Sequence, residues 1–109
     1  MYDSAFTPFG PTYLVGTSEV QVSATNNERP TAYRIRNLSA SQQWFTWAYD
    51  APGSPTPSIT VTAPTAGNPS TNTFGMAPNS VEVFGGLPKN AWFKASAAAA
   101  FEITAGEGL

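Results

Sequence analysis

Apolar and polar residues alternate with a period of two along most of this chain, a pattern typical of half-buried β-strands. The alternating runs, separated by turns rich in Gly, Pro, Asn and Ser, predict strands at 12–15, 19–24, 32–37, 44–49, 58–63 and 73–76, and three more in the last quarter of the chain. The first two are expected to pair with each other, and the strand at 58–63 is expected to face inward with Ile59 and Val61. No window shows the helical period of 3.6. We therefore expect an all-β, single-domain antiparallel β-sandwich, of jelly-roll or immunoglobulin-like type, with about eight short strands.

The last quarter of the chain gives the most detailed prediction. Its three strands are expected to form a meander in which Glu82 faces Lys94 and Lys94 faces Glu102. Each such cross-strand pair contributes a few tenths to about one kcal/mol. The same register places Phe84 opposite Trp92 on the charged face, where two large aromatic side chains need a cover from this chain or from a neighbour. The other face is then the core face, and it carries Val81, Val83, Ala91, Phe93, Ala95, Phe101 and Ile103.

The beginning of the chain differs in character from the rest. Two prolines and a glycine within residues 1–11 argue against a helix or a central strand. We therefore predict an extended N-terminal arm over 1–11 and a β-sandwich domain over 12–109. Tyr2, Phe6 and Phe9 are apolar anchors on this arm, which either packs on its own domain or docks on a neighbouring subunit.

The strand predicted at 44–49 is the most aromatic stretch of the chain. Alternation places Phe45, Trp47 and Tyr49 on one face and Trp44 on the other. One of these faces belongs to the core, which is the reading we favour. In the alternative reading, Trp44, Trp47 and Tyr49 form a platform on which a sugar stacks.

Composition narrows the functional classes. Only 11% of the residues are charged, against about 25% in a typical domain, and so neutral a surface suits a protein packed in an assembly. The net charge is −2 and the five basic residues form no run, so we expect no nucleic-acid binding. No segment approaches the roughly 18 apolar residues of a membrane span, so we expect no membrane association. Arg34 and Arg36 share the outer face of their strand, where they either stay solvated or pair acids of a partner.

The chain lacks the residues that most catalytic sites need. It contains no histidine and no cysteine, which excludes Ser–His–Asp and Cys–His sites and a typical zinc site. The seven acids are scattered singly along the sequence. We therefore predict a non-enzymatic protein without cofactor or metal. A fold that brought two carboxylates to within about 5–10 Å of each other in a cleft would reopen the question of catalysis.

Several motifs in the last 30 residues resemble one known class of protein. The segments 79–84, Leu87-Pro88, 91–93 and 101–108 resemble the C-terminal part of small β-rich virion structural proteins of tailed bacteriophages, and the strand 33–37 fits the same pattern. The likeness covers the middle of the chain loosely. It does not include the proline-rich arm or the loops around Pro52 and Pro64.

This resemblance implies a mechanical role. It implies a capsid decoration or cement protein, made in the host cytoplasm and located in the virion, which stabilises the head by binding subunits of the major capsid protein or other virion subunits. It also implies self-association, with a trimer as one arrangement left open. The alternative function is a carbohydrate-binding or receptor-binding module of a phage tail or fibre, which would use the aromatic side chains of 44–49.

Overall fold

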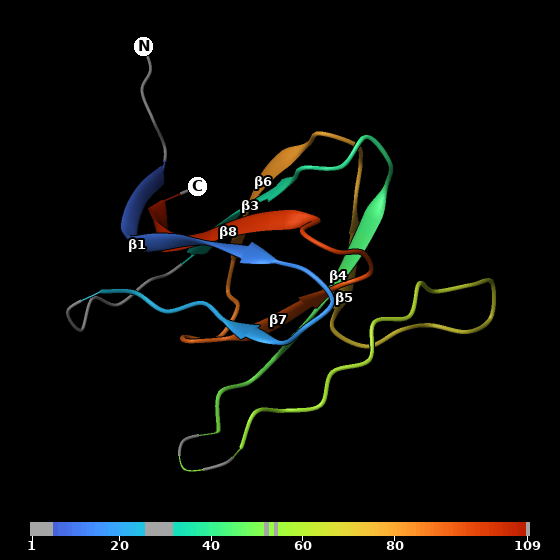
Figure 1. Ribbon diagram of the computed structural model, residues 1–109, viewed down its shortest axis with the longest axis horizontal. Helices are drawn as coiled ribbons and strands as arrows, with labels where there is room; N and C mark the ends of the chain where they lie inside the picture. The colour runs from blue at the N-terminus through green and yellow to red at the C-terminus, as the bar shows by residue number, and fades with distance from the viewer. Residues whose placement is uncertain (1–5, 26–31, 52, 54, 109) are drawn as a thin grey trace.

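The computed structural model describes residues 6–25, 32–51, 53 and 55–108 of the 109-residue chain. This part of the chain is all-β, with no helix, and its strands form two packed four-stranded antiparallel sheets (Figure 1). The prediction of a single-domain antiparallel β-sandwich is therefore confirmed. The strands are β1 (Phe6–Val15), β2 (Val20–Gln21), β3 (Ala32–Asn37), β4 (Gln43–Ala48), β5 (Thr73–Met76), β6 (Val81–Gly85), β7 (Trp92–Ala95) and β8 (Phe101–Gly108).

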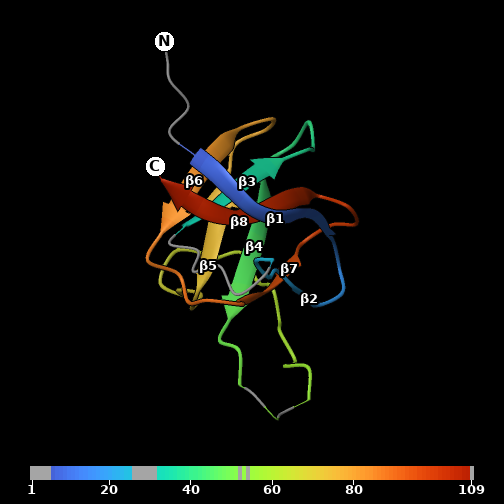
Figure 2. The same cartoon turned by 90° about the vertical axis from the view of Figure 1, so that its left-hand side faces the viewer.

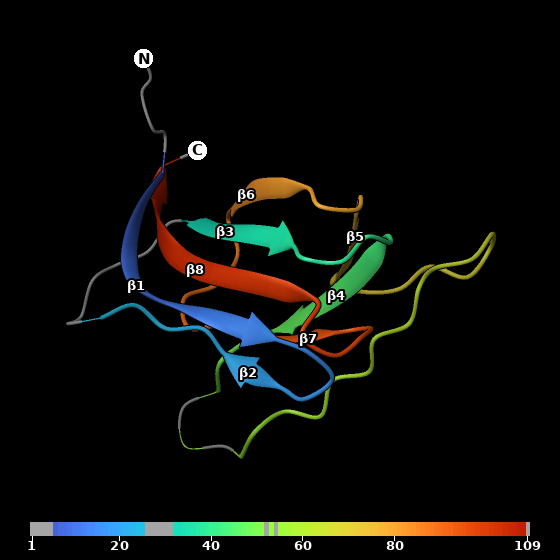
Figure 3. The same cartoon turned by 45° about the horizontal axis from the view of Figure 1, so that its top comes forward.

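The order of the strands shows how the chain is wound. One sheet, sheet A, has the order β1-β8-β3-β6, and these strands follow one another in Figure 3. The other, sheet B, has the order β2-β7-β4-β5. Among consecutive strands only β4 and β5 pair with each other. Every other connection carries the chain from one sheet to the other, so the expected pairing of 12–15 with 19–24 is wrong: β1 pairs with β8, and β2 with β7.

The predicted C-terminal meander is also wrong. Strands β6 and β8 lie on either side of β3 in sheet A, while β7 lies in sheet B. Glu82 therefore does not face Lys94, and Lys94 does not face Glu102. Alternation indicates which face of a strand is buried but not which strand it pairs with. The connections at 86–91 and 96–100 carry the chain from one sheet to the other instead of forming tight hairpins.

The expected core face is correct for β7 and β8 but inverted for β6. Ala91, Phe93, Ala95, Phe101 and Ile103 are buried as predicted. On β6 it is Phe84 that packs against the core. Val81 and Val83 belong to the outer face of sheet A, where Val81 is 45% exposed.

A cluster of aromatic rings fills the space between the sheets. Phe45 of β4 is fully buried at its centre. Its ring centroid lies 5.4 Å from those of Phe84 and Phe101, 5.6 Å from that of Phe74 and 5.9 Å from that of Phe93. These are distances at which tilted and edge-to-face aromatic pairs attract each other, so both sheets are tied to one ring of β4.

A buried asparagine fastens one end of the sandwich. Asn37, at the end of β3, is completely buried. Its amide nitrogen donates to the carbonyl oxygens of Ser41 at 3.0 Å, Met76 at 3.1 Å and Ala77 at 3.0 Å. Its amide oxygen accepts the N–H of Ser39 at 2.9 Å. One side chain thus joins the β3–β4 turn to the connection between β5 and β6.

Tyr33 holds the β6–β7 connection from the opposite end of β3. Its hydroxyl donates to the carbonyl oxygen of Pro88 at 2.6 Å and accepts the N–H of Ala91 at 3.2 Å. Burial raises the pKa of this phenol, and the Ala91 N–H offsets part of that rise. Its ring lies edge-on to Phe93 at 5.2 Å, so the same side chain serves the core and the loop.

The described part of the predicted arm, residues 6–11, is extended but belongs to a sheet. Strand β1 pairs with β8 from Phe6 onward, so the predicted boundary between residues 11 and 12 falls inside β1. The ladder is interrupted between Pro8 and Thr12, where prolines 8 and 11 have no N–H to donate. Figure 2 shows β1 and β8 next to each other, in blue and red. Gly106 permits this close approach, because a Cβ at that position would collide with the carbonyl oxygen of Thr7.

Candidate functional site

The residues predicted to make protein contacts are spread over the molecule. Phe6 and Phe9 are half-buried on β1, and Tyr2 lies outside the described residues. Phe84 and Trp92 do not face each other, because β6 and β7 belong to different sheets. Phe84 is covered from within the chain, while Trp92 is half-buried on the outer face of sheet B. A role for these five residues in binding a partner stays a prediction.

The three residues of the alternative stacking platform do not share one surface. Trp47 and Tyr49 form an edge-to-face pair with ring centroids 5.0 Å apart, and Tyr49 is 66% exposed. The Nε1 atom of Trp47 is buried and has no hydrogen-bond partner among the described residues. Trp44 lies on the other face of sheet B, where its ring covers Gly75 so closely that a Cβ there would be 2.7 Å from Cζ3. A ligand could therefore stack on Trp47 and Tyr49 but not on all three.

The most prominent feature outside the sheets is a ribbon formed by residues 58–72 between β4 and β5. It projects from the sandwich as the yellow-green loop of Figure 1. At its tip the backbones of Thr65 and Asn68 exchange two hydrogen bonds of 2.8 and 3.1 Å around Gly67, and residues 62–69 are all exposed. No charged residue occurs between Asp50 and Glu82. This absence of charge was the one sequence signal that could have singled out the segment.

Two charged side chains hold the base of the ribbon against sheet B. The carboxylate of Glu19 accepts the N–H of Ile59 at 2.9 Å, and the ammonium of Lys94 donates to the carbonyl oxygen of Ile59 at 2.8 Å. Glu19 and Lys94 also pair with each other at 3.4 Å. The Ile59 N–H, and to a smaller degree Lys94, hold the pKa of Glu19 below its usual range. We call this arrangement the clamp.

The clamp corrects the prediction made for residues 58–63. They were expected to form a strand with Ile59 and Val61 facing inward, but they pair with neither sheet. Ile59 is buried, with 5% of its surface exposed, yet it lies outside the core cluster between the sheets. Both of its charged partners stand on the outer face of sheet B, so the ribbon crosses that face.

Strands β5 and β6 end their sheets on the same side of the sandwich, and each has one edge that pairs with none of the described strands. The rings of Phe74 and Phe84 meet there across the two sheets at 5.3 Å. Phe74 is 39% exposed and Val81 is 45% exposed. We call the exposed pair Phe74 and Val81 the apolar edge. Unpaired strand edges and exposed apolar side chains are both features through which chains associate.

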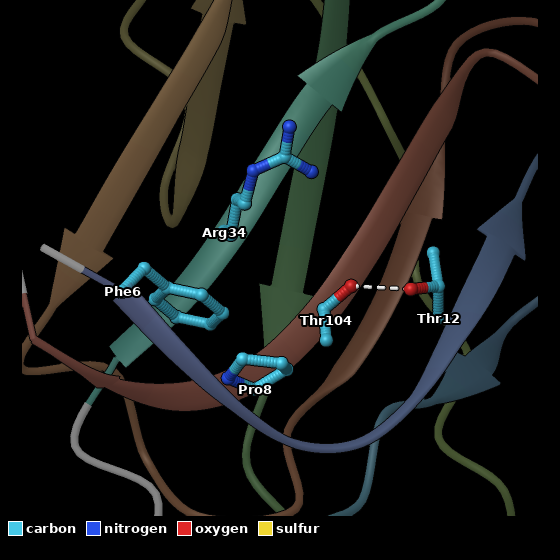
Figure 4. A pocket seen from close by; sticks show the side chains of 5 residues that line it. All are labelled: Phe6, Pro8, Thr12, Arg34 and Thr104. Carbon is cyan, nitrogen blue, oxygen red and sulfur yellow. Dashed lines mark hydrogen bonds between the residues drawn. The ribbon is translucent and has the colours of Figure 1, made fainter. Parts of the chain in front are cut away.

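A hollow of about 320 Å³ lies on the outer face of sheet A, where β1 bends away from β8. Figure 4 shows its lining: Phe6, Pro8 and Thr12 from β1, Thr104 from β8 and Arg34 from β3. The rings of Phe6 and Pro8 stand on one side of the hollow. The hydroxyls of Thr12 and Thr104, hydrogen bonded to each other at 2.7 Å, stand on another.

Positive charge gathers beside this hollow. Arg34 and Arg36 point to the same outer face of β3, as alternation predicts. A single carboxylate serves them: Arg34 pairs with Glu102 at 3.6 Å, and Arg36 forms no ion pair with any described residue. Both members of the Arg34–Glu102 pair are partly exposed, so the pair contributes little to stability and can exchange partners.

The described residues include no group of three or more acids able to hold a metal ion. These residues also contain no helix that is long and apolar enough to cross a membrane. The two clusters that bring charged side chains together, the clamp and the Arg34–Glu102 pair, each consist of one acid and one base within 4.0 Å. Comparison of the chain with protein-family models, with curated proteins and with solved structures found no match.

Proposed function

We propose that this chain is a non-enzymatic structural protein of a bacteriophage virion, most specifically a capsid decoration or cement protein that binds subunits of the major capsid protein. The observation that supports it is the projecting ribbon, an exposed segment without charge that is anchored to the sandwich by the clamp. Burying such a segment against a neighbour removes no charge from water, so the large cost of desolvating a charge is avoided and its polar groups need only hydrogen-bond partners.

The apolar edge supplies a second contact surface of the same kind. Phe74 and Val81 are exposed, and β5 and β6 each have a backbone edge that pairs with none of the described strands. A neighbouring subunit that covered this edge would bury apolar surface at about 25 cal/mol per Å² and could add a strand to either sheet. Many copies on one shell would act together, so a weak contact per copy would still stiffen the particle.

Mass spectrometry and cryo-electron microscopy of purified virions test this proposal directly. The proposal expects the chain in stoichiometric amounts on the outside of the head. Its absence from mature particles would overturn it.

A pair of variants tests the role of the ribbon. Ala66→Glu places one negative charge at the ribbon tip, and Thr17→Glu places the same charge in the exposed turn between β1 and β2. If the ribbon lies in the contact, Ala66→Glu weakens binding to particles stripped of the protein, and Thr17→Glu leaves it unchanged. Equal binding by both variants would exclude the ribbon from the interface.

The second candidate function is a carbohydrate-binding or receptor-binding module of a tail or fibre, and the exposed ring of Tyr49 beside Trp47 favours it. Binding to a glycan array that is lost in Tyr49→Ala, a variant of an exposed side chain, would support this function. The location of the protein in purified virions separates the two candidates, since a tail module is absent from isolated heads.

A further inference from the structure

We propose that the hollow lined by Phe6, Pro8, Thr12, Arg34 and Thr104 is a binding site for one acidic sugar residue, a pyranose ring that carries a carboxylate. This site is separate from the ribbon and from the apolar edge, since it opens on the outer face of sheet A. Its volume of about 320 Å³ is at the small end of the range of roughly 300–1,000 Å³ found for ligand sites. That size suits a single ring.

The charge beside the hollow selects a carboxylate. Arg34 lines the hollow, and its guanidinium presents donors in a planar fork that matches a carboxylate. Its present partner, Glu102, is held at 3.6 Å, a distance longer than a good charge-assisted hydrogen bond. Arg36 adds a second positive charge to the same face. A ligand carboxylate would therefore compete with Glu102 for Arg34, and the positive charge of Arg36 would favour the ligand.

The other walls select a hydroxylated ring rather than the end of a peptide. Strands β3 and β8 are both central in sheet A, so their ladders already use the main-chain groups that a peptide would need. Pro8 has no N–H to offer. The hydroxyls of Thr12 and Thr104 are the polar groups left for a ligand. One of them donates its proton to the other, so the pair keeps one hydroxyl proton and several lone pairs with which to bind a ligand. Phe6 and Pro8 give the C–H face of a sugar an apolar surface.

Nuclear magnetic resonance titration of the ¹⁵N-labelled protein with methyl β-glucuronide tests the proposal. We expect saturable shifts confined to residues of β1, β3 and β8 around the hollow, with a dissociation constant on the order of 1–10 mM. Methyl β-glucoside, which carries a hydroxymethyl group in place of the carboxylate, should bind at least about tenfold more weakly. Acetate, which lacks the ring, should also bind at least about tenfold more weakly.

Variants of the chain sharpen the test. Arg34→Gln should weaken binding by about tenfold or more, because the charge-assisted bonds are lost. Glu102→Gln removes the internal competitor and should strengthen binding by up to about fivefold. Lys89→Gln removes an exposed charge from the β6–β7 connection and serves as the matched control, with unchanged binding expected. The resonances of the unbound protein show in each case that the fold is intact.

Four results would overturn the proposal. They are the absence of saturable shifts around the hollow, equal binding of methyl β-glucoside or acetate, unchanged binding in Arg34→Gln, and tighter binding of the peptide Gly-Gly-Phe than of methyl β-glucuronide to the same residues. The last result would assign the hollow to a protein C-terminus instead. None of these results bears on whether the chain is present in virions.

Discussion

Replacement of Asn37 should destabilise the protein more than its small side chain suggests. In Asn37→Ala, three carbonyl oxygens and one N–H lose the partner that they have in the native structure. The amide has only two hydrogens for its three acceptors, so at most three full hydrogen bonds are lost, including the one that the amide oxygen accepts. Each is worth about 0.5–1.5 kcal/mol net, which gives a loss of roughly 1.5–4.5 kcal/mol.

Asn37→Asp should destabilise the protein further than Asn37→Ala. A carboxylate would place a negative charge against the carbonyl oxygens of Ser41, Met76 and Ala77, with no hydrogen left to donate. Two outcomes are open to the aspartate: it stays charged in a buried site, or it takes up a proton at neutral pH. Both cost free energy. Asparagine and aspartate have nearly the same size and shape, so a loss of stability in Asn37→Asp cannot come from packing.

Urea denaturation followed by tryptophan fluorescence measures both losses. Against a total stability of about 5–15 kcal/mol, a change of roughly 1.5–4.5 kcal/mol shifts the denaturation midpoint clearly. Asn68→Ala is the control, because Asn68 is exposed at the ribbon tip and bonds Thr65 through backbone atoms alone. The reasoning is refuted if Asn37→Ala unfolds within 0.5 kcal/mol of the control, a margin of about the size of an ordinary surface substitution, or if Asn37→Asp is no less stable than Asn37→Ala.

Three further predictions concern other anchors of the fold. First, the pKa of Glu19 is depressed in the folded protein, so its hydrogen bond to the Ile59 N–H stabilises the fold above the ordinary glutamate pKa of about 4.3 and is lost as pH falls through the lower folded value. The Ile59 amide resonance should shift over that pH range. A shift that persists in Glu19→Gln would contradict this assignment. Second, Tyr33→Phe should cost about 1–3 kcal/mol in urea denaturation, because it leaves a buried amide without a partner; a cost below 0.5 kcal/mol, the scale of surface substitutions, would contradict it. Third, Gly106→Ala should push the first residues of β1 away from β8, since the new Cβ meets the carbonyl oxygen of Thr7. Amide hydrogen exchange should accelerate at Phe6 and Thr7 and not over the rest of sheet A, and unchanged protection of these two amides would show that β1 accommodates the methyl group.

Alternation predicted the faces of strands well and their partners poorly. Phe93 and Phe101 are buried as their positions in the pattern required, and the burial of Phe45 identifies the core face of 44–49, which the pattern had left open. A period of two is a property of one strand, whereas pairing depends on where the chain goes between strands. For β6, both faces carried apolar side chains, so the pattern could not decide between Val83 and Phe84. The ring cluster around Phe45 decides it in favour of Phe84.

The sequence pattern did not predict most of the candidate site. Arg34 was placed on the outer face correctly, but nothing in the pattern brings Phe6 and Thr104 to the same hollow across nearly the whole chain. For the first part of the ribbon, residues 58–63, the alternation of Ile59 and Val61 with polar residues predicts a strand. Alternation does not reveal that Glu19 and Lys94 bind the Ile59 peptide instead. Such long-range contacts follow from topology, which the pattern left open.

The position of β8 in the middle of sheet A has a consequence for how the protein reaches its native state. Residues Thr12 and Thr104 meet across β1 and β8 although they are far apart in the chain. Neither β1 nor β3 can complete its ladder until residues 101–108 have left the ribosome, because β8 lies between them. Folding of the sandwich should therefore wait for β8 and be slow, in the range of milliseconds to seconds found for sandwiches of high contact order. Nascent chains that stall before β8 would expose two unpaired strand edges to self-association and to chaperones.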